Sequence, residues 1–262
     1  MLNWEDDVRF VLGGVTFQTV PPEEFMPREV PGEGEFAIFK SPALVEHYAA
    51  LVTELRPQRV FELGISMGGS TVFFTELARP RRLVAIDLRP REDVIERIER
   101  LAADRGLSGA LRTVGEVDQA DRPRLAQIIE EEFDGSSLDL VVDDCSHMYE
   151  PTRASFNELF PRLRPGGVYV IEDWAWAHNP LDSDHPEGWL PDEVPLTRLL
   201  FEIGLAIPSV PGLIKEISID GEAAVITRGD AEVDPSDFDI SACSSPRGQA
   251  LLAPTILSST ET

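Results

Sequence analysis

The sequence is poor in positive charge. Lysine occurs only at Lys40 and Lys215, and 23 lysine and arginine residues stand against 47 acidic ones, which gives a formal net charge of -24. Nucleic acids and anionic membranes are bound through basic faces, so this charge argues against both as partners. We therefore expect a small or neutral molecule as the partner.

Cysteine and long apolar runs are also scarce. Cys145 and Cys243 are the only cysteines among 262 residues, too few for a disulfide framework and typical of a reducing compartment. Residues 1–7 show neither the basic start nor the apolar core of a signal peptide, and no apolar run reaches membrane-spanning length. These features predict a cytoplasmic protein.

Composition divides the chain into three parts. Residues 1–40 mix acids, prolines and scattered aromatics, which predicts an irregular N-terminal cap. Residues 41–228 alternate apolar runs with helical patterns, beginning with Ser41-Pro42, a typical helix start. Residues 229–262, rich in serine, aspartate and proline, are expected to form a loosely ordered tail.

The middle part predicts an α/β fold with a doubly wound, mostly parallel sheet, because strand and helix signals alternate. Strands of such a sheet are buried on both faces and read as continuous apolar runs. Four such runs close on acids, namely Glu62, Asp87, Asp143-Asp144 and Glu172-Asp173. Near the end, Asp220-Gly221 lies between two further strand-like runs, which predicts a terminal antiparallel hairpin.

A glycine-rich turn, residues 64–70, follows the first of these strands. Glycines there let the backbone approach a ligand, and an acid that ends the second strand, here Asp87, can accept hydrogen bonds from a ribose. The separation of Glu62 from Asp87 agrees with that rule. Such turns also serve as plain strand-to-helix connections, but together with Asp87 this one predicts a ribose-containing cofactor.

The acids at the strand ends are expected to meet along one rim of the sheet. Carboxylates buried together gain proton affinity unless a cation neutralises them, so a hard divalent ion such as magnesium, calcium or manganese accounts for the two acidic pairs. Their alternative role is to cap helices or bind backbone amides. His147, on the turn after Asp144, is the candidate general base, with His178 in reserve, although a lone histidine is often only structural. Residues 174–189 read as a loop over the rim.

Several segments together resemble the class I methyltransferases that use S-adenosylmethionine, and more narrowly the macrocin and mycinamicin O-methyltransferase family, which methylates sugar hydroxyls of natural products with a divalent metal. These segments are Glu62-Leu63-Gly64, Asp87, Asp143-Asp144-Cys145-Ser146-His147, Arg164-Pro165-Gly166-Gly167 and Glu172-Asp173. The resemblance covers about residues 57–175 and implies a Rossmann-like methyltransferase fold. Cys145 departs from the family pattern, which usually has glycine there, and residues 115–119 look like an expanded form of its Gly-Asp-Gln segment.

The resemblance also implies roles for individual residues. It makes His147 the base and assigns Asp144, Glu172 and Asp173 to the metal, with magnesium expected. The candidate cofactor-binding residues are Glu62, Gly64, Ser66, Ser70, Asp87, Asp118, Gln119 and Asp143.

The predicted protein is a metal-dependent O-methyltransferase that moves a methyl group from S-adenosylmethionine to a hydroxyl of a natural-product sugar in antibiotic biosynthesis. We expect a small-molecule glycoside as acceptor and a homo-oligomer as the assembly. Two alternatives stay open: a catechol-like phenol as acceptor, or a binding or cyclisation protein that retains the cofactor without transferring its methyl group. A dehydrogenase is disfavoured because the turn lacks the Gly-x-Gly-x-x-Gly spacing.

Overall fold

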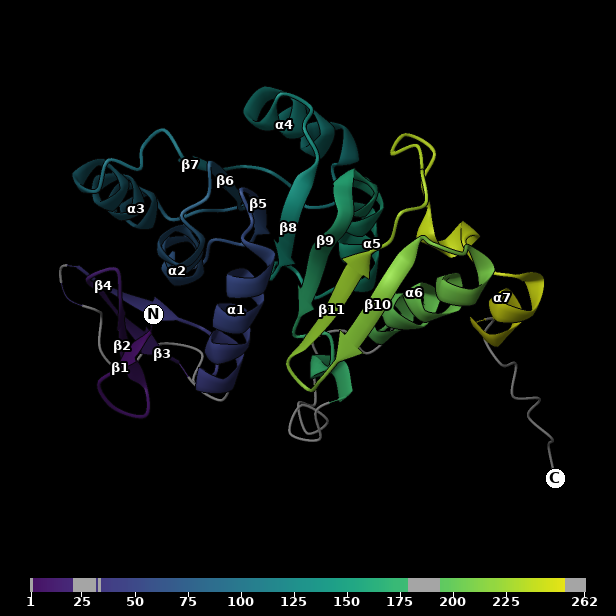
Figure 1. Cartoon of the computed structure of the whole chain (residues 1–262), viewed down its shortest axis with the longest axis horizontal. Helices are drawn as coiled ribbons and strands as arrows, with labels where there is room; N and C mark the ends of the chain where they lie inside the picture. The colour runs from purple at the N-terminus through teal and green to yellow at the C-terminus, as the bar shows by residue number, and fades with distance from the viewer. Residues whose placement is uncertain (1, 21–31, 33, 179–193, 253–262) are drawn as a thin grey trace.

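A seven-stranded sheet forms the centre of the molecule (Figure 1). The computed structural model describes residues 2–20, 32, 34–178 and 194–252. The strand order is β10-β11-β9-β8-β5-β6-β7. The strands are β5 (Arg59–Leu63), β6 (Arg82–Ile86), β7 (Leu111–Val114), β8 (Leu138–Asp143), β9 (Leu163–Glu172), β10 (Ile214–Ile219) and β11 (Ala223–Arg228).

Strand directions in this sheet confirm the predicted mostly parallel arrangement. Strands β5 to β9 pair with their neighbours in parallel, whereas β11 pairs antiparallel with β9, and β10 antiparallel with β11. The antiparallel pair is the hairpin predicted around Asp220-Gly221. The chain therefore has the Rossmann-like fold expected from the sequence.

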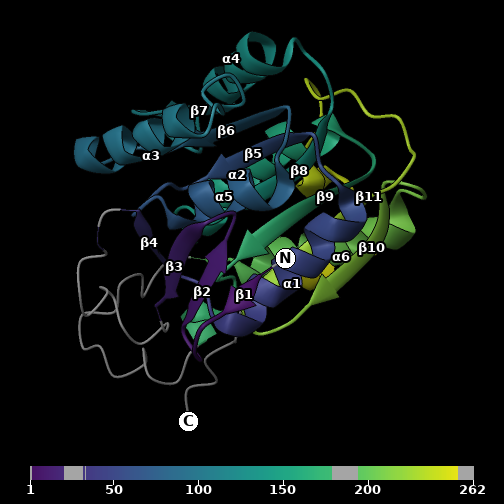
Figure 2. The same ribbon diagram turned by 60° about the vertical axis from the view of Figure 1, so that its left-hand side comes forward.

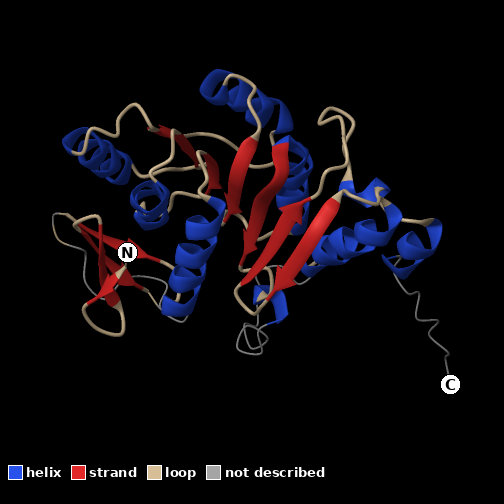
Figure 3. Ribbon diagram, in the orientation of Figure 1, coloured by secondary structure: helices blue, strands red, loops and turns tan. Residues whose placement is uncertain are grey.

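Helices cover both faces of this sheet (Figure 3). One hydrophobic cluster joins α1, α2 and α3 to one face, and a second joins α4, α5 and α6 to the other. Successive side chains of a strand point to opposite faces of the sheet, so β5 contributes to both clusters. Phe61 and Leu63 belong to the second cluster and Val60 to the first. The helices are α1 (Pro42–Leu55), α2 (Gly69–Ala78), α3 (Glu92–Asp104), α4 (Arg122–Phe133), α5 (Tyr149–Leu159), α6 (Thr197–Ser209) and α7 (Pro246–Leu252), with short 3-10 turns η1 (Phe160–Arg162), η2 (Trp176–His178) and η4 (Ile240–Ala242).

The described part of residues 1–40 forms a second, small sheet, so the expectation of an irregular cap was wrong. Its order is β1 (Asn3–Trp4), β2 (Arg9–Leu12), β3 (Val15–Thr19) and β4 (Glu35–Ile38). Buried residues alternate with less buried ones along β2 and β3, and Gly13 and Gly14, both at positive φ, form the two-residue turn between them. Figure 2 shows this sheet beside α1, and its aromatic side chains share the cluster of α1 and α2.

The described part of the C-terminal segment is also ordered, contrary to the expected loose tail. Phe238 and Ile240 are buried, and Asn157 of α5 accepts a hydrogen bond from the Ile240 amide at 2.9 Å. Burial of these apolar side chains holds the segment against α5, while residues 253–262 lie outside the described part of the chain. Among the described residues, no helix has both the length and the apolar character needed to cross a membrane.

Candidate functional site

The carboxyl ends of three neighbouring strands lie at one level of the large sheet. Leu63 pairs with Asp143 between β5 and β8, and Asp143 pairs with Ile171 between β8 and β9. The next residues along these strands are Gly64, Asp144 and Glu172. The register therefore brings the glycine-rich turn and the two acidic pairs to one rim, as the sequence predicts, at the point where the strand order reverses.

Glycine is required at two positions of the turn. Gly64 has φ +98°, and a Cβ added to it would lie 2.1 Å from the carbonyl oxygen of Asp144. A Cβ on Gly69, the first residue of α2, would lie 1.9 Å from the carbonyl oxygen of Ala37, the residue before the end of β4. The turn is thus packed directly against the backbone of β8 on one side and of the small sheet on the other.

Asp87, at the end of β6, fixes the conformation of this turn. Its Oδ2 accepts hydrogen bonds from the amides of Ile65 and Ser66, at 3.0 and 3.2 Å, and its Oδ1 accepts one from the amide of Arg89. The predicted ribose acceptor is therefore adjacent to the predicted ligand turn. Its role toward a ribose stays a prediction.

A pocket opens between the turn and the small sheet. It is lined by predicted residues and by others from β4 and the segment after it, together Ala37, Phe39, Lys40, Gly64, Ile65, Ser66, Met67, Gly69, Ser70 and Asp144. The first turn of α2 faces this pocket, and the positive end of a helix dipole favours an anionic group there. The sequence did not indicate that residues 37–40 contribute to the site.

Glu62 lies beneath the turn as a buried acid. Its side chain is fully buried, and within the described residues neither carboxylate oxygen has a hydrogen-bond partner. Burial raises the pKa of Glu62 to about 7 because it removes water from the charged form, while the nearby Ser70 and Thr71 hydroxyls and Lys40 act in the opposite direction. An unpaired buried carboxylate beside a turn without side-chain bulk suits a ligand that carries hydrogen-bond donors, as the predicted nucleoside cofactor does.

Asp143 is buried, and its carboxylate joins three neighbouring segments by hydrogen bonds. It accepts hydrogen bonds from Gln119 Nε2 at 2.8 Å, Ser155 Oγ at 2.8 Å and Tyr169 OH at 2.7 Å. Burial raises the pKa of Asp143 to about 6. Gln119 in turn accepts a hydrogen bond from the amide of Ser146, so the pair positions the turn that carries His147.

The other two predicted cofactor residues of this region, Asp118 and Gln119, do not line the pocket. The carboxylate of Asp118 accepts a hydrogen bond from the amide of Ala120 at 2.8 Å and is exposed. Gln119 is buried and bonded as described above. Their contact with a cofactor stays a prediction.

Asp144, His147 and Asp173 come together at the open side of the rim. His147 Nε2 lies 3.8 Å from Asp144 Oδ1 and 3.9 Å from Asp173 Oδ2. One ligand atom from each residue can be chosen so that all three lie within 4.8 Å of one another. The two carboxylates fit a hard divalent cation, and the imidazole lies directly beside them.

Two of these residues have unusual backbone conformations. His147 has φ +55° and Asp173 φ +50°, the left-handed region that non-glycine residues enter at a cost of about 1 kcal/mol or more. Such strain concentrates at ligand-binding sites, where the surrounding structure imposes it. The carbonyl of His147 also accepts a hydrogen bond from Trp176 Nε1 at 2.9 Å, which ties its turn to η2.

Glu172, the third predicted metal ligand, is held by residues that sequence reasoning missed. Lys40 Nζ donates to Glu172 Oε1 and Oε2 at 2.7 and 2.6 Å, and also to Asp144 Oδ2 at 2.8 Å. Tyr48 OH of α1 donates to Glu172 Oε1 at 2.6 Å. The one signal in the sequence is that a rare lysine directly precedes the Ser41 helix cap, among apolar neighbours.

The protonation states of Lys40, Asp144 and Glu172 depend on one another. Burial alone would lower the pKa of Lys40, but the Asp144 and Glu172 carboxylates raise it above its ordinary value, so the ammonium persists. Burial alone would raise the pKa of Asp144, but Lys40 and His147 hold it below its usual value. Burial and the neighbouring Asp144 raise the pKa of Glu172, and Lys40 acts in the opposite direction.

Within the described part of the chain, three further features singled out in the sequence take no part in these contacts. His178, the reserve base, is paired with Thr197 Oγ1 of α6 at 2.5 Å. Burial raises the pKa of the Cys145 thiol, as suits a side chain that packs rather than reacts. The part of the 174–189 loop beyond His178 lies outside the described residues.

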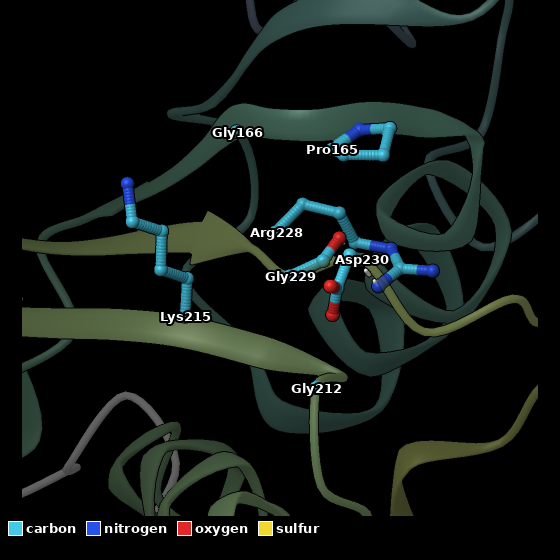
Figure 4. A pocket seen from close by; sticks show the side chains of 7 residues that line it. All are labelled: Pro165, Gly166, Gly212, Lys215, Arg228, Gly229 and Asp230. Carbon is cyan, nitrogen blue, oxygen red and sulfur yellow. Dashed lines mark hydrogen bonds between the residues drawn. The ribbon is translucent and has the colours of Figure 1, made fainter.

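A second pocket lies at the opposite end of the sheet and contains none of the predicted site residues (Figure 4). Its residues come from the start of β9 and β10 and from the end of β11, among them Lys215 and Arg228. The Arg228 guanidinium donates to the carbonyls of Leu213 and Gly229, which closes the end of the hairpin. This arginine is therefore a structural residue.

Comparison with known proteins agrees with this geometry. A family model described as a methyltransferase domain matches residues 61–174. A tetracenomycin 3'-O-methyltransferase of Streptomyces olivaceus, which acts on a 2-methoxy-rhamnosyl derivative, is 32% identical over 145 residues, covering 52% of this chain and 33% of that protein. Mycinamicin VI 2''-O-methyltransferase of Micromonospora griseorubida is 54% identical over 43 residues, 16% of this chain and 11% of that enzyme.

Among solved structures, the MycE methyltransferase of the mycinamycin biosynthetic pathway, in complex with Mg, SAH and mycinamycin VI, superposes with a TM-score of 0.53 and 26% identity. The match covers 71% of this chain and 49% of that one. The chain thus spans about half of the solved relative and a third or less of the two curated ones. Residues 61–174 therefore match a methyltransferase domain, and the chain is similar in fold to the MycE methyltransferase.

Proposed function

We propose that this protein is an O-methyltransferase that uses S-adenosylmethionine and a divalent metal ion to methylate a sugar hydroxyl of a glycosylated natural product. The observation that carries the proposal is the meeting of Asp144, His147 and Asp173 at the rim, beside the pocket of the glycine-rich turn. The sugar specificity is supported by the relatives, which are O-methyltransferases of sugar-bearing compounds. The low cysteine content supports a cytoplasmic site of action.

The cofactor is proposed to bind at the glycine-rich turn. Gly64 and Gly69 leave the backbone free of side-chain bulk, Asp87 accepts a hydrogen bond from an amide of the same turn, and Glu62 offers an unpaired carboxylate. S-adenosylmethionine bound there would supply an electrophilic methyl group. Ser66 and Ser70 line the same pocket and are proposed to donate or accept hydrogen bonds to it.

The metal ion is proposed to be held by the acids of the rim, Asp144 and Asp173 on the open side and Glu172 as far as Lys40 releases it. A divalent ion there would acidify a bound hydroxyl of the acceptor. Magnesium is the expected ion because the donors are mainly carboxylates.

His147 is proposed as the general base that accepts the hydroxyl proton on Nε2. The carboxylates of Asp144 and Asp173, 3.8 and 3.9 Å away, stabilise the positive charge that the ring acquires. Because the strained turn and the Gln119 contact fix the backbone at this position, the imidazole is held at the rim before the acceptor arrives.

The test is methyl transfer from labelled S-adenosylmethionine to a panel of glycosylated polyketides, their aglycones and catechols, with and without a chelator. We expect transfer to the glycosides alone and its loss on chelation. His147→Gln should lower kcat by about 10²–10⁴-fold with unchanged cofactor affinity, whereas the matched variant His178→Gln should retain activity. An unaffected His147→Gln would reject this base, and preferred transfer to catechols would reject the sugar acceptor.

A further inference from the structure

We propose that Lys40 removes Glu172 from the predicted metal ligands, so that a divalent ion binds the protein through Asp144 and Asp173. This inference rests on the metal-dependent part of the proposed function. It concerns which of the chain's own residues the ion can reach.

The first argument is the occupancy of the Glu172 carboxylate. Both of its oxygens accept hydrogen bonds from Lys40 Nζ, at 2.6 and 2.7 Å, and Oε1 accepts a further one from Tyr48 OH. The side chains of Lys40 and Glu172 are 1% and 3% exposed. An ion that bound Glu172 would have to enter the space of the ammonium group, and a displaced buried charge is costly.

The second argument is the orientation of the other two acids. Asp144 divides its oxygens, because Oδ2 accepts from Lys40 while Oδ1 lies on the side of His147. The Asp173 side chain is 62% exposed and its Oδ2 lies 3.9 Å from the same imidazole nitrogen. These two oxygens therefore flank one accessible region, on the side of Asp144 away from Lys40.

The third argument is charge and coordination. Lys40 already occupies both oxygens of Glu172, which leaves the carboxylates of Asp144 and Asp173 for a divalent ion. Magnesium is usually bound by one or two protein carboxylates, with the rest of its octahedral shell from water and substrate oxygens. Two protein ligands thus leave coordination positions for an acceptor, and Lys40 acts as a positioning residue for Asp144.

The experiment measures Mn²⁺ binding directly, by the loss of the free-ion electron paramagnetic resonance signal, on the full chain without acceptor or cofactor. Three single variants are compared with the wild type: Glu172→Gln, Asp173→Asn and, as a control with the same charge change on the exposed face of α1, Glu54→Gln. We expect Asp173→Asn to weaken binding by ~10-fold or more, on the order of the loss that follows removal of a group that tunes a metal site. The factor by which Glu172→Gln weakens Mn²⁺ binding should be less than a third of the factor found for Asp173→Asn. Glu54→Gln should bind Mn²⁺ as the wild type does.

The proposal would be overturned if Glu172→Gln weakened Mn²⁺ binding by a third or more of the factor found for Asp173→Asn. It would also be overturned if the wild type bound no Mn²⁺ at millimolar concentration. A second comparison uses Lys40→Met, which frees Glu172. It should bind Mn²⁺ more tightly than the wild type, and Glu172→Gln should then cost more in the Lys40→Met background than in the wild type. Equal costs in the two backgrounds would also overturn the proposal.

Because Lys40→Met leaves two carboxylates without their buried cation and can fail to fold, the comparison of Glu172→Gln with Asp173→Asn decides by itself. Failure of the proposed function has a different signature. Wild-type protein that binds both Mn²⁺ and S-adenosylhomocysteine, but transfers no methyl group to any acceptor, would refute the function while leaving the ligand assignment in place.

Discussion

Single residues of the rim owe their properties to burial of charge and to backbone geometry. Lys40, Glu62 and Glu172 are charged or chargeable groups with 3% exposure or less. Removing water from such groups makes each protonation state depend on its immediate neighbours. Glu62 differs from the other two because, within the described residues, its oxygens have no partner, so its effect on stability can be tested separately.

Glu62 makes stability depend on pH. Its pKa is about 7 in the folded chain against an ordinary value of 4.5, so the folded state favours the protonated form and stability falls as pH rises through this interval. In ligand-free protein, Glu62→Gln should gain free energy of unfolding relative to the wild type between pH 5 and pH 8, by up to about 3 kcal/mol. Urea denaturation at several pH values measures this difference, and a difference that stays constant with pH would contradict it.

Gly64 tests the close approach of the turn to β8. Gly64→Ala places a Cβ 2.1 Å from the Asp144 carbonyl at φ +98° and should destabilise the fold by ~3 kcal/mol or more. The matched variant is Gly106→Ala, which has φ +67° but no heavy atom within 4 Å of the added Cβ; it should cost only the backbone strain, about 1–2 kcal/mol. Equal losses in denaturant unfolding would show that the contact with Asp144 is unimportant.

At the scale of elements, the start of α1 fixes the segment that carries Lys40. Ser41 is the N-cap, and its Oγ accepts a hydrogen bond from the Leu44 amide at 3.1 Å, with Pro42 at the first helical position. Ser41 Oγ also donates to Glu222 of the turn before β11 at 2.8 Å. One hydroxyl therefore caps the helix and joins it to the hairpin.

Ser41→Ala should lower the free energy of unfolding by about 1 kcal/mol, the usual cost of a lost cap. Thr53→Ala, on the exposed face of the same helix, is the control and should stay within about 0.5 kcal/mol of the wild type. Chemical denaturation of both variants is the measurement. A Ser41 variant as stable as the Thr53 variant would mean that α1 is held by packing alone.

The sequence predicted the large sheet because its strands are continuous apolar runs ending in acids, and it predicted the rim because parallel strands end on the same edge. The small sheet was missed because the alternation of Phe10, Leu12, Val15 and Phe17 around Gly13-Gly14 lies in a region dominated by proline and acid signals. Lys40 could not be predicted as a partner of Asp144, because their contact joins residues 104 positions apart and depends on the packing of β4. Aspartate and histidine enter the left-handed region more often than most residues, but residue type alone does not say that His147 and Asp173 are the ones that do so.

For the whole molecule, the dominant property is its net charge of -24. Like charges on a compact surface repel one another. Salt limits the range of this repulsion to about 30 Å at 0.01 M and about 8 Å at 0.15 M. The melting temperature should therefore rise from 0.01 M to 0.15 M sodium chloride, by about 2–4 °C for each kcal/mol of relieved repulsion. Calorimetry at fixed pH measures the shift, and a fall in melting temperature would show that ion pairs outweigh the repulsion.

The close approach of the Ala37 carbonyl to Gly69 makes residues 37–40 one wall of the pocket at the glycine-rich turn and the start of α2 the other. A molecule seated there would touch both, so residues 37–40 and the start of α2 could not separate until it had left. Its residence time would then limit how often β3 and β4 exchange their amide hydrogens, and a protease would cut the N-terminal segment more slowly in proportion to the ligand's occupancy.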